Sequence, residues 1–140
     1  MRRRRRTEIL INGSFKLSET MTHAILENHQ VRVIQEPENG LVMLKIRETS
    51  QRSLFYPGEI LATECKVQID GAVGIGIVAG DEPKLSYNLA VIDAAFQADL
   101  TETSDWPELL ENEERAIQER EAKAYHSIMK TKVNFETMDV

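Results

Sequence analysis

The spacing of apolar residues predicts two helical segments in residues 1–30. A short apolar patch at 7–11 ends at Asn12-Gly13, and glycine suits the left-handed conformation in which helices often end. From Ser14 onward, apolar side chains recur at intervals of three and four residues, which places them on one face of a helix. The residues of this face are Leu17, Met21, Ala24 and Ile25. We therefore expect one or two helical turns at 7–11 and an amphipathic helix that ends near His29.

The pattern changes after residue 30 to short runs rich in β-branched residues, which are typical of strands. Segments 31–37 and 41–49 flank the dipeptide Asn39-Gly40, which is a strong signal for a two-residue hairpin turn. We therefore expect a first pair of antiparallel strands that reverses direction at Asn39-Gly40.

A second pair of strands is expected after a turn at Pro57-Gly58. Alternate residues of segment 61–69 share one strand face: Leu61, Thr63, Cys65, Val67 and Ile69. Asp70-Gly71 is another hairpin dipeptide, and segment 72–80 returns after it. Parallel neighbours would need crossovers of about a dozen residues. The four segments therefore predict an antiparallel meander.

Two further helices are expected after the strands. Asp81 is a suitable N-cap, Pro83 is tolerated in a first helical turn, and an amphipathic pattern follows to about Ala98. A capping-box pattern at Asp105 begins a last helix that runs to about Lys130. The expected fold class is α+β, with a four-stranded antiparallel β-meander flanked by N-terminal helices and two C-terminal helices.

The last helix carries a narrow apolar stripe among many acidic residues. The stripe consists of Trp106, Leu110, Ile117, Ala124 and Ile128. Such a narrow stripe cannot lie deep in a monomeric core, so we expect it on the domain surface or against another chain. Residues 131–140 show neither a cap nor a period and are predicted to form an irregular tail.

Length and composition indicate one globular domain over residues 1–140, with 41% apolar and 29% charged residues. No apolar run approaches the roughly 18 residues that span a bilayer. The arginine-rich start lacks the apolar stretch of a secretory signal. Cys65 is the only cysteine, so no disulfide can form within the chain. We therefore expect a cytoplasmic protein that has no membrane partner.

Charge is distributed unevenly along the chain, whose net charge is −6. Arg2 to Arg6 form a basic N-terminal arm (residues 1–6), and the remaining 12 basic and 23 acidic residues give the rest a net charge of −11. An acidic body repels a phosphate backbone, so a nucleic-acid partner would have to bind the arm alone. We expect instead that the arm caps the first helix, stays solvated or binds an acidic surface of a partner.

Residues 74–79 satisfy the G-x-G-x-x-A form of a dinucleotide-binding motif. The mechanism of that motif requires a turn from a strand into a helix, whereas these glycines lie within an expected strand, so no nucleotide cofactor is predicted. Gly74, Gly76 and Gly80 share one strand face and leave it almost bare, which marks a close approach of another element. Either the last helix of the same chain or a partner protein could supply that element.

No group of residues predicts catalysis or metal binding. His23 and His29 are six residues apart, on opposite sides of their helix, and His126 lies near the end of the last helix. Cys65 alternates with apolar residues and is expected in the core, where a thiol is inert. We therefore expect no catalytic, cofactor-binding or metal-binding residues in this chain, and no cofactor.

Several short motifs occur in an order and spacing that are specific as a set. They are the sequence GLV at 40–42, GE at 58–59, TE-x-x-V at 63–67, Gly80-Asp81, Asp93 in its helix, and V-x-F-x-T-M at 133–138, together with the basic start RRRRTEIL. On these motifs the chain resembles the PhnG family. Relatives often carry an aromatic residue in the glycine-containing strand where this chain has Ile75 and Ile77. A stacking role for that strand is therefore not expected.

The resemblance implies an accessory, non-catalytic subunit of the bacterial carbon–phosphorus lyase core complex in phosphonate catabolism. In that family the complex forms ribose 1-methylphosphonate 5-triphosphate from ATP and methylphosphonate, with loss of adenine, and the family has no established catalytic residues to transfer. The implied partners are a PhnI-like subunit first, and then PhnH- and PhnJ-like subunits. The isolated chain is expected to self-associate through surfaces meant for these partners.

The residues expected at a partner interface come from the bare strand face, the helical stripe and the tail. They are Gly74, Gly76, Gly80, Trp106, Leu110, Ile117 and Phe135. A stand-alone nucleic-acid-binding or regulatory module that uses the basic arm is the alternative hypothesis.

Overall fold

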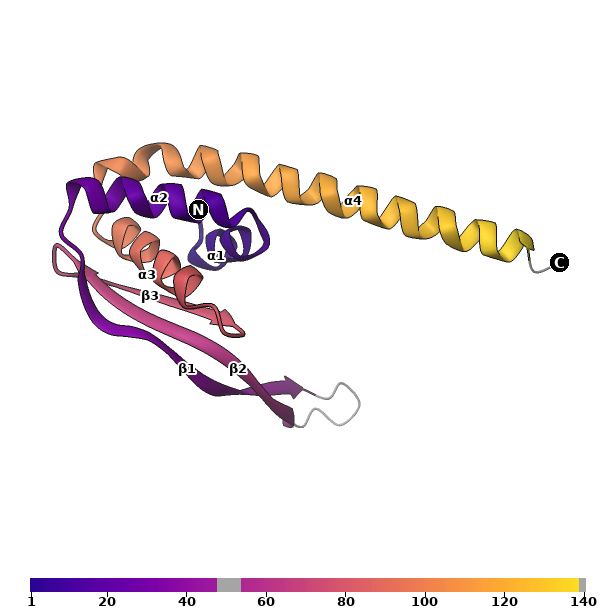
Figure 1. The fold of residues 1–140 in the computed structure, drawn as a ribbon, viewed down its shortest axis with the longest axis horizontal. Coiled ribbons are helices and arrows are strands. Elements are labelled where there is room, and N and C mark those ends of the chain that lie inside the picture. Colours follow the sequence, from indigo (N-terminus) through magenta and orange to yellow (C-terminus); the bar gives the residue numbers. More distant parts are fainter. Residues whose placement is uncertain (48–53, 139–140) are drawn as a thin grey trace. The chain divides into compact units, whose positions relative to one another are not determined.

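The computed structural model describes residues 1–47 and 54–138 (Figure 1). The chain divides into two compact units, one formed by Phe15–Ser104 and the other by Met1–Ser14 with the chain from Asp105 onward. Each unit has its own arrangement of helices or strands, and each is considered by itself below.

The unit Phe15–Ser104 is a layered α+β structure. Its elements are α2 (Phe15–Asn28), β1 (Arg32–Arg47), β2 (Leu54–Ile69), β3 (Ala72–Ala79), α3 (Pro83–Gln97) and the start of the 3-10 helix η1 (Thr101–Asp105). Within the described residues the strands form one antiparallel sheet in the order β1-β2-β3. Helix α3 packs on this sheet and α2 packs on α3 (Figure 1).

The sheet has three described strands in place of the four that the sequence predicts. Arg32–Arg47 is one continuous strand that passes through Asn39-Gly40, and these two residues pair with Thr63 and Ala62 of β2. Neither Asn39 nor Gly40 has a positive φ, which a tight hairpin turn of the expected type would require. Pro57-Gly58 likewise lies inside β2. The expected turns at these two dipeptides are therefore wrong.

The hairpin between β2 and β3 is confirmed at Asp70-Gly71. Both residues have positive φ, 49° and 82°, as a two-residue turn of the type I′ class requires. On β2, Thr63, Cys65, Val67 and Ile69 are buried on one face, as their alternation predicts. Leu61 belongs to the same alternation but is 43% exposed.

Strand β3 meets α3 through its glycines. A Cβ atom on Gly74 would overlap the carbonyl oxygen of Ala90, and one on Gly76 would overlap the carbonyl oxygen of Ser86. Because these oxygens belong to the helix backbone, the space cannot be made by a side-chain movement. The bare strand face is therefore covered by α3 of the same chain, and not by the last helix or a partner protein as the sequence allowed.

A buried carboxylate joins the same two elements. Asp93 on α3 is 5% exposed, and its Oδ2 accepts the backbone N–H of Ile75 on β3 at 3.0 Å. A hydrogen bond to a charged group contributes about 1.5–3 kcal/mol when it is well formed. The acid that interrupts an apolar helix in the sequence thus fixes the register of α3 along β3.

The end of α2 is joined to η1 by a partly buried contact between the side chains of His29 and Glu102. The Nε2 atom of His29 lies 3.0 and 2.9 Å from the two carboxylate oxygens of Glu102. A hydrogen bond from the backbone amide of Glu102 and the contact with His29 lower the pKa of the Glu102 carboxyl below its ordinary value of 4.5. Glu102 is therefore stabilised as a carboxylate in the folded state.

This contact predicts a specific loss of stability in acid. A carboxyl whose pKa is lower in the folded state stabilises the fold above its ordinary pKa of 4.5, and that contribution is lost as the pH falls through the folded value. The free energy of unfolding should therefore fall more steeply below pH 4.5 for the natural chain than for Glu102→Gln. Denaturant unfolding at a series of pH values measures both curves. Parallel curves below this pH would show that the carboxylate of Glu102 contributes nothing to stability.

The second unit contains α1 (Arg3–Asn12) and α4 (Trp106–Met138). Helix α1 packs on α4, and Arg5 forms a two-point ion pair with Glu114, with 3.0 Å from Nε to Oε2 and 2.6 Å from Nη2 to Oε1. The arginine segment is thus helical from Arg3, and Arg5 binds an acidic residue of its own chain, not the acidic surface of a partner that the sequence allowed. Helix α4 continues to Met138, past the end near Lys130 that the sequence predicts.

No helix in the described part of the chain is long and apolar enough to cross a membrane.

Candidate functional site

A hydrogen-bonded cluster around Thr63 joins the three strands to the start of α3. The hydroxyl oxygen of Thr63 lies 2.6 Å from the carbonyl oxygen of Gly80 and 3.0 Å from Oδ1 of Asn39. The same oxygen accepts the backbone N–H of Glu82 at 3.0 Å. Thr63 is 1% exposed, so water cannot replace these bonds. We call Asn39, Thr63, Gly80, Asp81 and Glu82 the Thr63 cluster.

Asp81 takes part in the Thr63 cluster and does not cap α3. The N-cap residue of α3 is Glu82, and its side chain makes no capping bond. Asn39 Nδ2 instead donates to Oδ1 of Asp81 at 3.2 Å. Motifs that are far apart in the sequence, Asn39-Gly40, Thr63 and Gly80-Asp81, therefore meet at one place in the fold.

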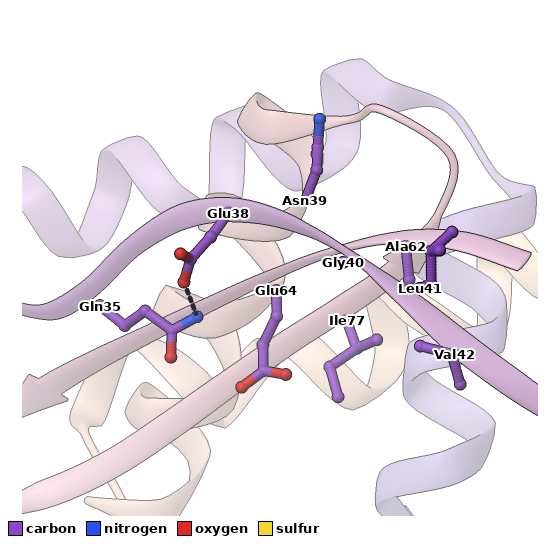
Figure 2. Close-up of a pocket in the computed structure, with 9 residues that line it drawn as sticks. All are labelled: Gln35, Glu38, Asn39, Gly40, Leu41, Val42, Ala62, Glu64 and Ile77. Atoms are coloured by element: carbon purple, nitrogen blue, oxygen red, sulfur yellow. Dashed lines mark hydrogen bonds between the residues drawn. The ribbon is translucent and has the colours of Figure 1, made fainter.

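A groove of about 260 Å³ lies beside this cluster. Its walls come from β1, β2 and β3, and Figure 2 labels the 9 lining residues. Gly40, which has no side chain, pairs directly with Ala62, whose side chain is a single methyl group, and this pair leaves a hollow between larger neighbours. A Cβ atom on Gly40 would have no atom within 4 Å, which shows that the groove is open at this point.

The groove is apolar on one side and acidic on the other. Ile77, which pairs with Glu64 across β2 and β3, is 49% exposed and Val42 is 46% exposed. Two carboxylates, those of Glu38 and Glu64, also line the groove (Figure 2). They would repel an anionic ligand such as a nucleotide or a phosphonate.

The two carboxylates differ in their neighbours. Glu38 accepts a hydrogen bond from the side-chain amide of Gln35 at 3.3 Å, as the dashed line in Figure 2 shows. Oε1 of Glu64 lies 3.3 Å from Nζ of Lys66. Among the described residues, Glu38 thus has an amide neighbour and no cation, so it keeps its charge available for a positive group.

Large apolar side chains are exposed where the hairpin of β1 and β2 extends past β3. The pairing of β3 with β2 ends at Ala62, whereas β1 and β2 stay paired beyond it. Among the side chains that the structure describes in this extension, the large apolar ones that are between 38% and 66% exposed are Leu41, Val42, Met43, Ile60 and Leu61. We call these five residues the apolar hairpin patch. Because consecutive residues point to opposite faces, the patch exposes apolar groups on both faces of the hairpin.

The reactive side chains are not arranged for chemistry. Cys65 is fully buried, and this burial raises the pKa of its thiol to about 11, so the thiolate that acts as a nucleophile does not form at neutral pH. His29 is bonded to Glu102. No group of three or more potential metal ligands occurs in the described part of the chain.

The residues that the sequence placed at a partner interface lie in different environments. Gly74 and Gly76 are covered by α3, and Gly80 (φ 89°) forms the bend after β3 and donates its N–H to the Leu61 carbonyl at 2.8 Å. Trp106 and Leu110 are buried, whereas Ile117 is partly exposed. Phe135 lies outside the residues whose side chains the structure describes. The buried members of this set offer no free surface.

Sequence reasoning missed the groove and the apolar hairpin patch. The dipeptide Asn39-Gly40 predicts a turn and therefore places the residues around it at a hairpin tip. The available signal was the run Leu41-Val42-Met43 opposite Ile60-Leu61. Consecutive apolar residues occupy both faces of a strand, and only one of these faces can be covered by α3.

Comparison with known proteins assigns the chain to phosphonate metabolism. A family model described as "Phosphonate metabolism protein PhnG" matches residues 1–139. The chain therefore belongs to the PhnG family, which confirms the resemblance noted in the sequence. A search of the curated proteins found no match.

Proposed function

We propose that this chain is an accessory, non-catalytic subunit of the carbon–phosphorus lyase core complex. In this role it supports the formation of ribose 1-methylphosphonate 5-triphosphate from ATP and methylphosphonate. Its partners are a PhnI-like subunit first and then PhnH- and PhnJ-like subunits. Membership of the PhnG family supports this proposal at the level of the pathway.

The apolar hairpin patch is the observation that carries the proposal. Leu41 is 66% exposed and Met43 is 57% exposed, next to each other on a hairpin that no other described strand extends. A two-stranded hairpin is marginally stable in water, and large apolar groups gathered on a surface mark sites of protein association. Burial of this apolar surface against a partner would stabilise the complex by about 25 cal/mol for each Å² removed from water.

The basic arm supports the accessory role more than the nucleic-acid alternative. Arg5 is paired with Glu114, and Arg4 lies 3.3 Å from Glu8. These arginines already neutralise carboxylates of their own chain. Release of the arm to a phosphate backbone would break those contacts and expose the acidic surface of α4.

Reconstitution of the reaction tests the proposal. The chain is mixed with PhnI- and PhnH-like subunits, and adenine released from ATP in the presence of methylphosphonate is measured. We expect no release from the chain alone, and release from the mixture that falls by at least about tenfold when the chain is omitted. Release by the chain alone at the rate of the mixture would refute a non-catalytic role. Undiminished release without the chain would refute an accessory role.

A further inference from the structure

We propose that the groove at Gly40 and Ala62 receives one apolar side chain of the partner subunit, flanked by an arginine or lysine that pairs with Glu38. This inference rests on the proposed function, since it names the chemistry of the partner segment that the subunit binds. It concerns a site on the open sheet face that shares Leu41 and Val42 with the apolar hairpin patch.

The shape of the groove favours a single inserted side chain. Its volume of about 260 Å³ is below the roughly 300–1,000 Å³ of typical small-molecule sites. The hollow exists because Gly40 and Ala62 pair across the strands, and Ile77 and Val42 provide apolar walls. A buried anchor side chain in such a hollow is the usual centre of a protein interface.

Charge decides which chemistry can occupy the groove. The ionisable groups that line it are two carboxylates, and Glu38 faces only the neutral amide of Gln35 at 3.3 Å among the described residues. A nucleotide or phosphonate would bring negative charge next to these carboxylates. An arginine or lysine beside the inserted apolar residue would instead gain a charge-assisted hydrogen bond.

The backbone at Gly40 allows a direct test of occupancy. Gly40 has no positive φ, and an added Cβ would meet nothing within 4 Å, so a residue with a side chain can be introduced there without backbone strain. Gly40→Leu would then occupy the hollow itself. Gln68→Leu is the matched control, because it adds the same side chain to the same sheet face at a site that does not line the groove.

Binding of the full chain to the co-expressed PhnI-like subunit is measured for each variant, and thermal unfolding verifies that each is folded. We expect Gly40→Leu to weaken binding by at least about 30-fold, the loss typical of a blocked anchor, and Gln68→Leu to change it by less than about threefold. Glu38→Gln should weaken binding several-fold and reduce its salt dependence, whereas Glu36→Gln, an acid outside the groove, should not.

The outcomes separate this inference from the proposed function. If the natural chain binds the PhnI-like subunit and folded Gly40→Leu binds equally well, the groove is not the anchor site and the inference is wrong, while the proposed function stands. If Gly40→Leu abolishes only self-association of the isolated chain, the occupant is a second copy and the inference is again wrong. If the natural chain binds no partner subunit, the proposed function fails and the inference fails with it.

Discussion

Gly76→Ala is expected to destabilise the unit Phe15–Ser104 by about 3 kcal/mol, at the upper end of the range for overpacked cores. The new methyl group would overlap the carbonyl oxygen of Ser86 and would lie 2.7 Å from the backbone nitrogen of Ala90. Helix α3 would have to move away from β3 as a whole, which would also loosen the hydrogen bond between Asp93 and Ile75. Denaturant unfolding measures the loss as a lower midpoint with an unchanged slope.

Gly40→Ala is the matched control for this prediction. Both glycines lie in strands, but an added Cβ at Gly40 meets no atom within 4 Å. Removing a glycine whose conformation alanine can adopt stabilises a protein by about 0.4–1 kcal/mol. If Gly76→Ala is as stable as Gly40→Ala, the close packing of α3 on the glycines of β3 is not present in solution.

Thr63→Val is expected to cost about 2–3 kcal/mol, because valine keeps the volume of threonine and removes its hydroxyl group. The N–H of Glu82 and the carbonyl of Gly80 would lose the partner they have in the Thr63 cluster. These groups lie in the connection between β3 and α3, so the N-terminal turn of α3 should also exchange its amide hydrogens faster.

Thr63→Ser distinguishes the contribution of the hydroxyl group to stability from that of the methyl group. Serine retains the hydrogen bonds of the Thr63 cluster and loses one buried methyl group, at a cost of about 0.8 kcal/mol. The comparison uses unfolding free energies and hydrogen exchange of both variants. A valine variant that is no less stable than the serine variant would contradict the role assigned to the hydroxyl group.

The sequence predicted correctly those elements whose signals are local. The turn at Asp70-Gly71 follows from residues that tolerate positive φ, and α3 follows from its period and from Pro83 in the first turn. The alternation in 61–69 identified the face of β2 that is buried. In each case the residues that carry the signal are also the residues that adopt the structure.

The sequence failed where a partner distant in the chain decides the conformation. Asn39-Gly40 is a good turn dipeptide, but pairing with Thr63 and Ala62 keeps the backbone extended there. The side chain of Asn39 is held by Thr63 and Asp81, contacts over 24 and 42 residues that no local pattern shows. The groove depends on the same pairing and was therefore not predictable either.

The glycines of β3 show how far sequence reasoning can go. Their spacing correctly indicated that another element approaches the bare face closely, but the spacing does not say which element does so. The approaching element is α3, since backbone atoms of Ser86 and Ala90 lie against Gly76. A pattern of small residues therefore predicts a contact distance better than it predicts a contact partner.

The bond from Ile75 to Asp93 has a consequence for sheet growth. An outer strand normally offers unpaired backbone amides with which a strand of another chain can pair and extend the sheet. On β3 the amide of Ile75 is already engaged by a buried carboxylate, so an incoming chain would have to displace that charge from its hydrogen bond. At this position the β3 edge therefore offers no free amide to an incoming strand.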